Sequence, residues 1–280
     1  MKEKNLEQLR KRLEDVGLSL DIYKRLPPKY VRINPHFHVT KEELEKETGK
    51  LEKLNNLDIY RSSGVIHTGK LYDKGIYHIQ DLSSVLPVLL LDLKKGDSVL
   101  DLCSAPGLKT CLIHDLAKTE ITCVEKNRKR FNRMLKYFTL YGIRVKARCE
   151  DGVKFKGEYD KVLVDAPCSG EGIVSKYDSI LEESNHRVKR RSVTQKRLLQ
   201  NGFNLLKPGG IIVYYTCTLN KYENDVVIQK FLKKSSNAKL DNKIPDIELK
   251  LKKSEFGFRI IPGLSRGGFV SRIRKIKEKK

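Results

Sequence analysis

The stretch Ser98-Val99-Leu100-Asp101-Leu102-Cys103-Ser104-Ala105-Pro106-Gly107-Leu108-Lys109-Thr110 joins an apolar run to small, turn-forming residues. Apolar runs bounded by turn residues are typical of buried parallel strands, and we expect a helix to begin near Lys109. A strand, a tight turn and a helix N-terminus in direct succession let backbone amides approach a ligand closely. By itself the turn could equally be a plain strand–helix connection, because it is neither a GxGxxG fingerprint nor a phosphate loop.

Strands and helices alternate on both sides of this stretch. Further elements are expected at Leu82–Leu93 (helix), Ile121–Glu125 (strand), Arg128–Tyr141 (helix), Arg144–Arg148 (strand), Lys161–Val164 (strand), Val193–Leu206 (helix) and Ile211–Tyr215 (strand). Repeated βα units predict an α/β fold with a doubly wound, Rossmann-like sheet and helices on both faces. Lys230–Lys253 is predicted to be a loop or a frayed helix, and Arg259–Ile276 a late strand or an edge hairpin.

The first 78 residues have a different pattern. Apolar residues at helical spacing predict an amphipathic helix that packs on another element: Leu6, Leu9, Leu13, Val16 and Leu20. Strands are expected at Tyr30–Pro35, Leu57–Tyr60 and Gly75–Ile79, and a capping box of Thr40 and Glu43 opens a helix over Lys41–Lys50. We therefore predict two domains, a small α/β lobe over residues 1–78 and a larger domain over residues 79–280.

The chain is strongly basic along its whole length. Its 280 residues contain 57 Lys and Arg against 35 Asp and Glu, a net charge of +22. Such an excess favours a polyanionic partner, most simply nucleic acid, although a lysine-rich proteome would give the same balance.

Cysteine and histidine usage gives no sign of a metal site. The 6 cysteines form no CxxC pair, and the 6 histidines show no paired spacing. The N-terminus is charged and no apolar stretch approaches membrane-spanning length. We expect free thiols in a reduced cytoplasmic compartment, no metal and no membrane partner.

Two of these cysteines directly follow apolar strands. Cys168 follows Lys161–Val164 by a short turn, and Cys217 follows Ile211–Tyr215. The carboxyl ends of parallel strands line the ligand crevice of an open α/β sheet, so both thiols are expected at one cleft if the two strands are neighbours. The alternative is a pair of buried, inert cysteines that act as small hydrophobes.

An acidic residue ends the second strand of the sheet. Glu125 lies about twenty residues after the first turn, where a carboxylate can accept hydrogen bonds from ribose hydroxyls. A nucleoside cofactor without a pyrophosphate group fits this pattern, and S-adenosyl-L-methionine is such a cofactor.

Three motifs occur in a diagnostic order: Asp101-x-Cys103-x-Ala105-Pro106-Gly107-x-Lys109-Thr110, Asp165-Ala166-Pro167-Cys168-Ser169-Gly170-x-Gly172, and Thr216-Cys217-Thr218 with Glu223-Asn224. The chain resembles the NOL/NOP/Sun family of S-adenosylmethionine-dependent RNA 5-methylcytosine methyltransferases over about residues 75–275. Supporting matches are His78-Ile79-Gln80-Asp81, Gln195 with Leu198-Leu199, Lys207-Pro208-Gly209-Gly210, and Arg259 through Phe269, and the upstream Arg32-x-Asn34 region matches weakly. The resemblance implies a methyltransferase sheet with an N-terminal lobe like an RNA-recognition module.

The resemblance also implies roles for the two thiols. Carbon 5 of cytosine becomes nucleophilic only after a thiolate has added to carbon 6. In the family, Cys217 is the nucleophile and Cys168 assists release of the product. The residues alone leave this order open, because DNA-type cytosine methyltransferases attack from the Pro-Cys position.

Other site residues carry over from the same motifs. Asp165 is expected beside ring nitrogen 3 and the exocyclic amine of the cytosine, unless it only caps the next turn. Lys109 is expected in the active site, unless it is a surface lysine. Glu125 matches the ribose-binding position. Arg130 and Asp151 match positions that contact the cofactor in the family. Alternatively, Arg130 is an ordinary exposed helix residue and Asp151 forms a turn before Gly152. The expected cofactor loop comprises Cys103, Ser104, Ala105, Pro106, Gly107, Leu108 and Lys109.

Two positions depart from the family pattern. Leu108 stands where the family has a second glycine, so its backbone must adopt an ordinary angle or carry strain. Val270 stands where the family often has an aromatic residue.

We therefore expect an RNA cytosine-5 methyltransferase that acts on structured RNA as a monomer, with tRNA favoured by the compact chain. The alternatives are an rRNA methyltransferase, a non-catalytic RNA-binding assembly factor, and an enzyme acting on DNA cytosine. Phosphate contacts are expected from Arg187, Lys189, Arg190 and Arg191 and from the tail Arg272–Lys280. The small lobe is expected to contribute Tyr30, Arg32 and Phe37 to RNA binding.

Overall fold

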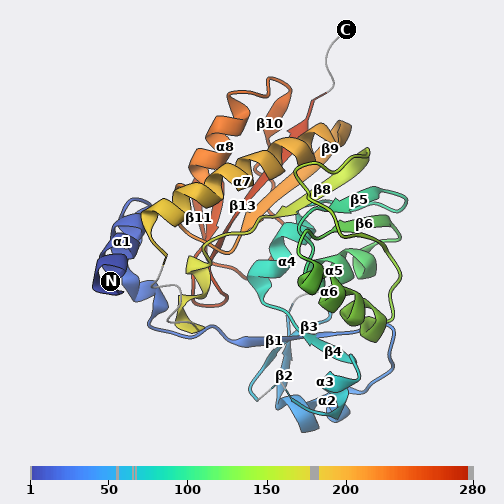
Figure 1. Cartoon of the computed structure of the whole chain (residues 1–280). Helices are drawn as coiled ribbons and strands as arrows, with labels where there is room; N and C mark the ends of the chain where they lie inside the picture. The colour runs from blue at the N-terminus through green and yellow to red at the C-terminus, as the bar shows by residue number, and fades with distance from the viewer. Residues whose placement is uncertain (1, 55–56, 65, 67, 177–182, 277–280) are drawn as a thin grey trace.

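The computed structural model of the chain describes residues 2–54, 57–64, 66, 68–176 and 183–276 (Figure 1). Its larger sheet has nine strands, eight of them in the order β11-β12-β13-β9-β8-β5-β6-β7, with β10 paired to β13. The bounds are β5 Ser98–Asp101, β6 Glu120–Val124, β7 Lys146–Arg148, β8 Tyr159–Asp165, β9 Leu206–Thr216, β10 Ala238–Leu240, β11 Leu251–Ser254, β12 Gly257–Ile260 and β13 Gly268–Lys275.

The strands from β7 to β9 are parallel and form the doubly wound core that the sequence predicts. The chain runs outward from β5 to β7 on one side and from β8 to β9 on the other, so the direction of winding reverses between β5 and β8. Ligands of open α/β sheets bind at this switch point, beyond the carboxyl ends of the strands.

Helices cover both faces of this sheet because inward-facing side chains alternate along the strands. Val99, Leu163 and Val213 pack toward α4 (Leu82–Leu89) and α5 (Leu108–Leu116). Leu100, Val162, Val164, Ile212 and Tyr214 pack on the opposite side with α7 (Asn185–Asn204) and α8 (Asp225–Leu232). The helix α6 (Arg128–Tyr141) packs on α5 through Phe131, Met134 and Phe138.

The smaller sheet is antiparallel, in the order β2-β3-β1-β4. Its strands are β1 Lys29–Ile33, β2 Leu51–Lys53, β3 Ile59–Ser62 and β4 Tyr77–Ile79, accompanied by α2 (Lys41–Thr48) and α3 (Lys70–Asp73). Val31, Leu44 and Tyr77 are in its core. The helix α1 (Lys2–Glu14) and the 3-10 turn η1 (Leu20–Tyr23) instead pack with Leu219, which follows β9 in the larger unit.

Buried polar contacts hold the small sheet against the large one. Arg32 is 2% exposed and pairs with Asp115 on α5, and it donates to the hydroxyl of Tyr141 on α6 at 2.6 Å. Tyr30 is 1% exposed, and its hydroxyl donates to the carbonyl of Leu264. The expectation that Tyr30 and Arg32 bind RNA is therefore wrong, because both side chains are buried in this interface, whereas Phe37 is exposed.

Two predicted segments also need correction. The helix α7 begins at Asn185 rather than Val193, so the basic run 187–191 lies within it. Lys230–Lys253 is not one loop, because it contains the end of α8, β10 and the start of β11. The late strand predicted within Arg259–Ile276 is present as β13, which lies between β9 and β12 and pairs with both.

The basic tail makes contacts within the protein over its described part, and of its arginines Arg272 is buried whereas Arg274 is exposed. Arg272 is 4% exposed and pairs with Asp241, while Arg274 lies 3.2 Å from the same carboxylate. Lys275 donates to the carbonyl of Leu206 at 2.6 Å. Residues 277–280 lie outside the described part of the chain. Among the described residues, no helix combines the length and apolar character needed to cross a membrane.

Candidate active site

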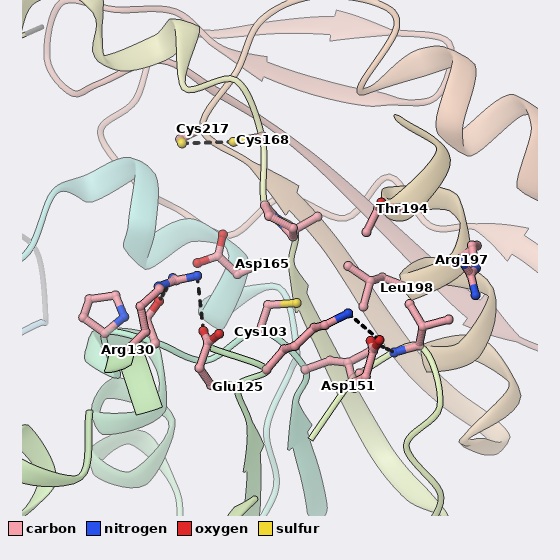
Figure 2. A pocket seen from close by; sticks show the side chains of 18 residues that line it. Cys103, Glu125, Arg130, Asp151, Asp165, Cys168, Thr194, Arg197, Leu198 and Cys217 are labelled. Atoms are coloured by element: carbon pink, nitrogen blue, oxygen red, sulfur yellow. Dashed lines mark hydrogen bonds and ion pairs between the residues drawn. The ribbon is translucent and has the colours of Figure 1, made fainter. Parts of the chain in front are cut away.

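A cavity of about 520 Å³ lies at the carboxyl ends of β5, β6 and β8 (Figure 2). Its volume is within the range of small-molecule sites. The wall is formed by Leu102, Cys103, Ala105, Pro106, Glu125, Lys126, Arg130, Asp151, Gly152, Val153, Asp165, Ala166, Pro167, Cys168, Thr194, Arg197, Leu198 and Cys217. The turn after β5, the turn after β8 and one face of α7 therefore surround a single space.

The two thiols meet at this cavity. Asp165 at the end of β8 is in register with Tyr215 on the parallel neighbour β9, so the loops that follow leave the sheet side by side. The Sγ atoms of Cys168 and Cys217 lie 3.1 Å apart (Figure 2). The prediction that both thiols reach one cleft from neighbouring strands is confirmed. The hydrogen bond with Cys217, together with burial, raises the pKa of Cys168 well above its usual value.

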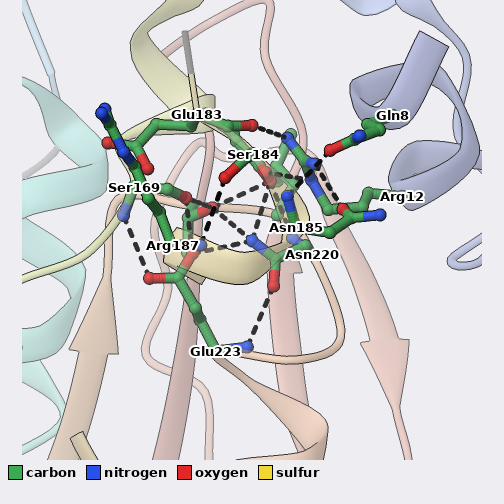
Figure 3. A network of polar contacts seen from close by, with 12 residues as sticks. Gln8, Arg12, Ser169, Glu183, Ser184, Asn185, Arg187, Asn220 and Glu223 are labelled. Carbon is green, nitrogen blue, oxygen red and sulfur yellow. Dashed lines mark hydrogen bonds and ion pairs between the residues drawn. The ribbon is translucent and has the colours of Figure 1, made fainter. Parts of the chain in front are cut away.

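A buried network holds the two cysteine loops together (Figure 3). Glu223 accepts from the backbone N–H of Ser169 at 3.0 Å and from Gln195 Nε2 at 2.8 Å. Asn220 Nδ2 donates to Glu223 at 2.8 Å and to Glu171 at 3.0 Å. Because Glu171 belongs to the Cys168 loop and Glu223 follows the Cys217 loop, these bonds fix each loop relative to the other.

The N-terminal helix contributes to the same network. Arg12 Nε donates to Glu171 Oε1 at 2.7 Å, and the two side chains are 2% and 0% exposed. Arg12 Nη1 donates to Asn185 Oδ1 at 2.7 Å, at the start of α7. Gln8 accepts from the backbone N–H of Asn185 at 2.8 Å (Figure 3). The helix α1 is thereby fastened to the loop that carries Cys168.

Lys109 has the carboxylate partner that its position suggests. Its Nζ lies 2.7 Å from Asp165 Oδ2 and 4.8 Å from the ring centroid of Tyr215. Burial lowers the pKa of Lys109, but the charge of Asp165 outweighs this and holds the pKa above its usual value. Lys109 does not line the cavity itself; it acts on it through Asp165.

The loop before α5 depends on one glycine. Gly107 has φ of 108°, a region that favours glycine, and an added Cβ would lie 2.6 Å from Phe138. Leu108 is the first residue of α5, and among the described residues the only non-glycine with positive φ is Asp92. Leu108 therefore sits there without strain. Of the predicted cofactor loop, Cys103, Ala105 and Pro106 line the cavity, whereas Ser104, Gly107, Leu108 and Lys109 are not among its lining residues.

Glu125 and Asp151 lie at the end of the cavity away from the two cysteines (Figure 2). Glu125 is 4% exposed and accepts from the backbone N–H of Asn127 at 2.7 Å. Arg130 Nη1 lies 3.2 Å from Glu125 Oε2, and its Nη2 donates to the carbonyl of Ala105 at 2.6 Å. Asp151 pairs with Lys126 at 2.6 Å, and this hydrogen bond lowers the pKa of Asp151.

Several wall residues were not anticipated. Thr194, Arg197 and Leu198 share one face of α7 at i, i+3 and i+4 spacing, which only the three-dimensional packing turns toward the cavity. Lys126 follows Glu125 directly, and Val153 closes the turn after β7. No local motif in the sequence marks these positions.

One group of metal-ligating residue types occurs in the described part of the chain, outside the cavity. His36, His114 and Asp115 place one ligand atom each within 4.8 Å of one another. Asp115 already accepts from Arg32 and from the hydroxyl of Tyr141, so the packing of the small sheet accounts for its position.

Comparison with known proteins assigns the fold and site to a family. The family model described as 16S rRNA methyltransferase RsmB/F matches residues 88–273. The chain belongs to this family. The resemblance seen in its three motifs is thereby confirmed.

Relatives in the family are named for different RNA substrates. The tRNA (cytosine(49)-C(5))-methyltransferase of Pyrococcus abyssi is 33% identical, with 84% of this chain and 78% of the relative covered. The ribosomal RNA small subunit methyltransferase F of Vibrio vulnificus is 36% identical, with 72% of this chain and 46% of the relative covered. The chain thus spans most of the archaeal relative and about half of the bacterial one.

Solved structures share the fold. The structure of NSun6 from Pyrococcus horikoshii with SFG superposes with a TM-score of 0.79 at 20% identity, covering 96% of this chain and 98% of that one. A methyltransferase homolog protein from Pyrococcus horikoshii gives a TM-score of 0.75 at 24% identity, covering 96% and 99%. At these identities the likeness establishes the doubly wound methyltransferase fold.

Proposed function

We propose that this protein transfers a methyl group from S-adenosyl-L-methionine to carbon 5 of a cytosine in a structured RNA, and that this RNA is a tRNA. The observation that carries the proposal is the pair of thiols, 3.1 Å apart, at a cavity that also contains acidic residues suited to a nucleoside. We further propose that the protein acts as a monomer in the cytoplasm and that the reaction needs no metal ion.

The cavity fits the cofactor. Glu125 Oε2 is buried and accepts no hydrogen bond, although Arg130 Nη1 lies 3.2 Å away, so a ribose hydroxyl entering the cavity can donate to it. Asp151 at the same end can accept from an adenine amine, and Arg130 closes the side of this pocket. When bound, S-adenosyl-L-methionine supplies an electrophilic methyl group.

The cysteines divide the work on the base. Cys217 attacks carbon 6 as a thiolate, which makes carbon 5 nucleophilic. Because its pKa is raised, Cys168 keeps its proton at neutral pH and can donate a hydrogen bond to the Cys217 thiolate, which stabilises the nucleophile. After methyl transfer, the proton on carbon 5 passes to a base, the bond between carbon 6 and the Cys217 sulfur breaks, and Cys217 leaves as the thiolate; Cys168 assists this elimination.

Asp165 and Lys109 orient the cytosine. Asp165 faces the cavity and is 27% exposed, so it can accept from the exocyclic amine, a group that uracil lacks. Lys109 fixes the Asp165 carboxylate from behind at 2.7 Å. The target base must be unpaired or flipped, because a stacked base cannot present carbon 6 to a thiolate.

The relatives support tRNA over rRNA as the substrate. The chain spans 78% of the archaeal relative that is named a tRNA methyltransferase, but 46% of a bacterial relative that is named for ribosomal RNA. Methylation of rRNA is the alternative. The small sheet, residues 29–79, is proposed as an accessory RNA-binding lobe in which Phe37 remains the exposed aromatic residue.

The activity can be tested with tritiated S-adenosyl-L-methionine and total RNA that lacks the modification. Label recovered as 5-methylcytidine would establish the reaction, and separation of tRNA from rRNA in the same run would identify the substrate. If no label appeared and calorimetry found no cofactor binding, the protein would instead be an RNA-binding assembly factor.

The roles of the thiols are tested by two variants. Cys217→Ser should lose turnover, because serine cannot supply the thiolate. Cys168→Ala should accumulate an RNA–protein adduct that survives a denaturing gel, because elimination stalls after attack. A fully active Cys168→Ala variant without adduct would contradict this assignment.

A further inference from the structure

A second groove lies beside the active-site cavity, between α7 and α8. These helices run side by side over one face of the large sheet (Figure 1). The groove has a volume of about 430 Å³ and is lined by Val193, Lys196, Arg197, Gln200, Lys230, Phe231, Lys233 and Lys234. Arg197 lines both the groove and the cavity, so the two spaces share a wall.

The charge of this groove is of one sign. Five of its lining residues are Lys or Arg and none is acidic. Within the described part of the chain, none of these five cations lies within ion-pair distance of a carboxylate. Burial and then the charges of Lys230 and Lys234 lower the pKa of Lys196, so the cations in the groove repel one another.

Another groove of the protein shows that this arrangement is not general. The groove next to the first residues of β5, β6 and β7 is lined by four cations, Lys146, Arg148, Lys154 and Lys156, together with three carboxylates, those of Glu120, Glu150 and Glu158. A lysine-rich composition alone would be expected to produce such mixed grooves. The absence of carboxylates distinguishes the groove between α7 and α8 from this second one.

The end of α8 does not account for the charge. Helix C-termini carry about half an elementary negative charge, which favours nearby lysines. Lys230 lies in the last turn of α8, and Lys233 and Lys234 follow it. Three lysines exceed what one helix end can balance, and Lys196 and Arg197 come from the middle of α7.

We propose that the groove between α7 and α8 binds backbone phosphates of the RNA substrate and so guides the strand toward the cysteines. This inference rests on the proposed function, since it supplies that function with a binding surface. Residues 193–200 of α7 extend over about 10 Å, the rise of about three nucleotides along one strand of a duplex. Gln200 can donate to the same phosphates, and the exposed side chain of Val193 can contact sugars.

The groove extends the basic surface that the sequence marks on α7. Arg187, Lys189 and Arg190 are exposed on the N-terminal half of this helix, near the cysteine loops. The groove continues that surface along the second half of the helix. A strand lying along α7 would therefore meet cations from Arg187 to Arg197.

The test compares two charge-matched triple variants of the full chain. The groove variant carries Lys196→Gln, Lys230→Gln and Lys234→Gln, and the control carries Lys146→Gln, Lys154→Gln and Lys156→Gln. Arg197 is left unchanged because it also lines the cavity. Both variants lose three positive charges, so a general effect of net charge would be equal in them.

Binding is measured with a transcribed, unmodified tRNA at several salt concentrations, and cofactor binding is measured by calorimetry. For the groove variant we expect at least about tenfold weaker tRNA binding and a log–log salt slope shallower by about two to three. Its cofactor affinity should match the wild type, and its methylation defect should lie in KM for tRNA rather than in kcat. The control should bind tRNA as the wild type does.

Equal loss of binding in both variants, or no loss in the groove variant, would overturn the proposal. The binding assay does not depend on catalysis. A wild type that binds tRNA without methylating it would therefore contradict the proposed function, while the groove would still be judged by the difference between the two variants.

Discussion

The buried ion pair between Arg12 and Glu171 should make a single residue of α1 essential for stability. The side chains are 2% and 0% exposed, and Glu171 also accepts from Thr218 and Asn220. Arg12→Met would remove the only cation on this carboxylate among the described residues. Loss of one partner of a buried pair costs about 3–5 kcal/mol, because the other charge stays buried and uncompensated.

This cost is large compared with the roughly 5–15 kcal/mol by which a typical domain is stable. At about 2–4 °C per kcal/mol for a chain of this size class, the midpoint of thermal unfolding should fall by about 10 °C. The chain has 12 tyrosines and no tryptophan, so far-ultraviolet circular dichroism in urea is the suitable measurement.

Two further variants make the reasoning refutable. Arg12→Met with Glu171→Gln removes both charges and should recover about 1–3 kcal/mol relative to Arg12→Met alone. Arg10→Met breaks the exposed pair with Glu7 on the same helix, whose side chains are 52% and 49% exposed, and should change stability by less than about 1 kcal/mol. If Arg12→Met were as mild as Arg10→Met, or if the double variant recovered nothing, the ion pair would not be the cause.

Two other residues give sharp expectations. Lys109→Met should lower kcat about 100-fold with little change in KM for the cofactor, because Asp165 loses the cation 2.7 Å away. Lys109→Arg should recover part of the rate. A wild-type kcat in the Lys109→Met variant would contradict this role. Burial raises the pKa of Asp101 from 3.8 to about 7. Between about pH 4 and pH 7 the folded state therefore holds a proton that the unfolded state releases. The free energy of unfolding should fall as the pH rises through this range. Asp101→Asn should flatten this dependence, as measured by urea midpoints at pH 5 and pH 8, and an unchanged slope would exclude Asp101 as its source.

The elements that are determined by neighbouring residues were predicted correctly from the sequence. The bounds of Arg128–Tyr141 follow from helical periodicity between the N-cap Asn127 and the left-handed Gly142. The meeting of Cys168 and Cys217 follows from strand ends in a parallel sheet. Each of these inferences needs only neighbouring residues and a general rule of topology.

Long-range packing explains what was missed. Arg12 and Glu171 are 159 residues apart, and no local motif marks either as a partner of the other. The strand-like run around β1 predicts a strand, but not that α5 and α6 cover Arg32. The first turns of α7 are mostly charged, so the apolar periodicity becomes visible only after Val193.

The position of β13 has a consequence for how the protein is made. This strand, Gly268–Lys275, lies between β9 and β12, and it is synthesised after every other strand of the large sheet. Until then β9, which leads into the Cys217 loop, has an unpaired edge that can associate with other nascent chains. Ribosomes that stall before Gly268 should therefore release products that aggregate, and a competent methylation site should form only after β13 has been synthesised.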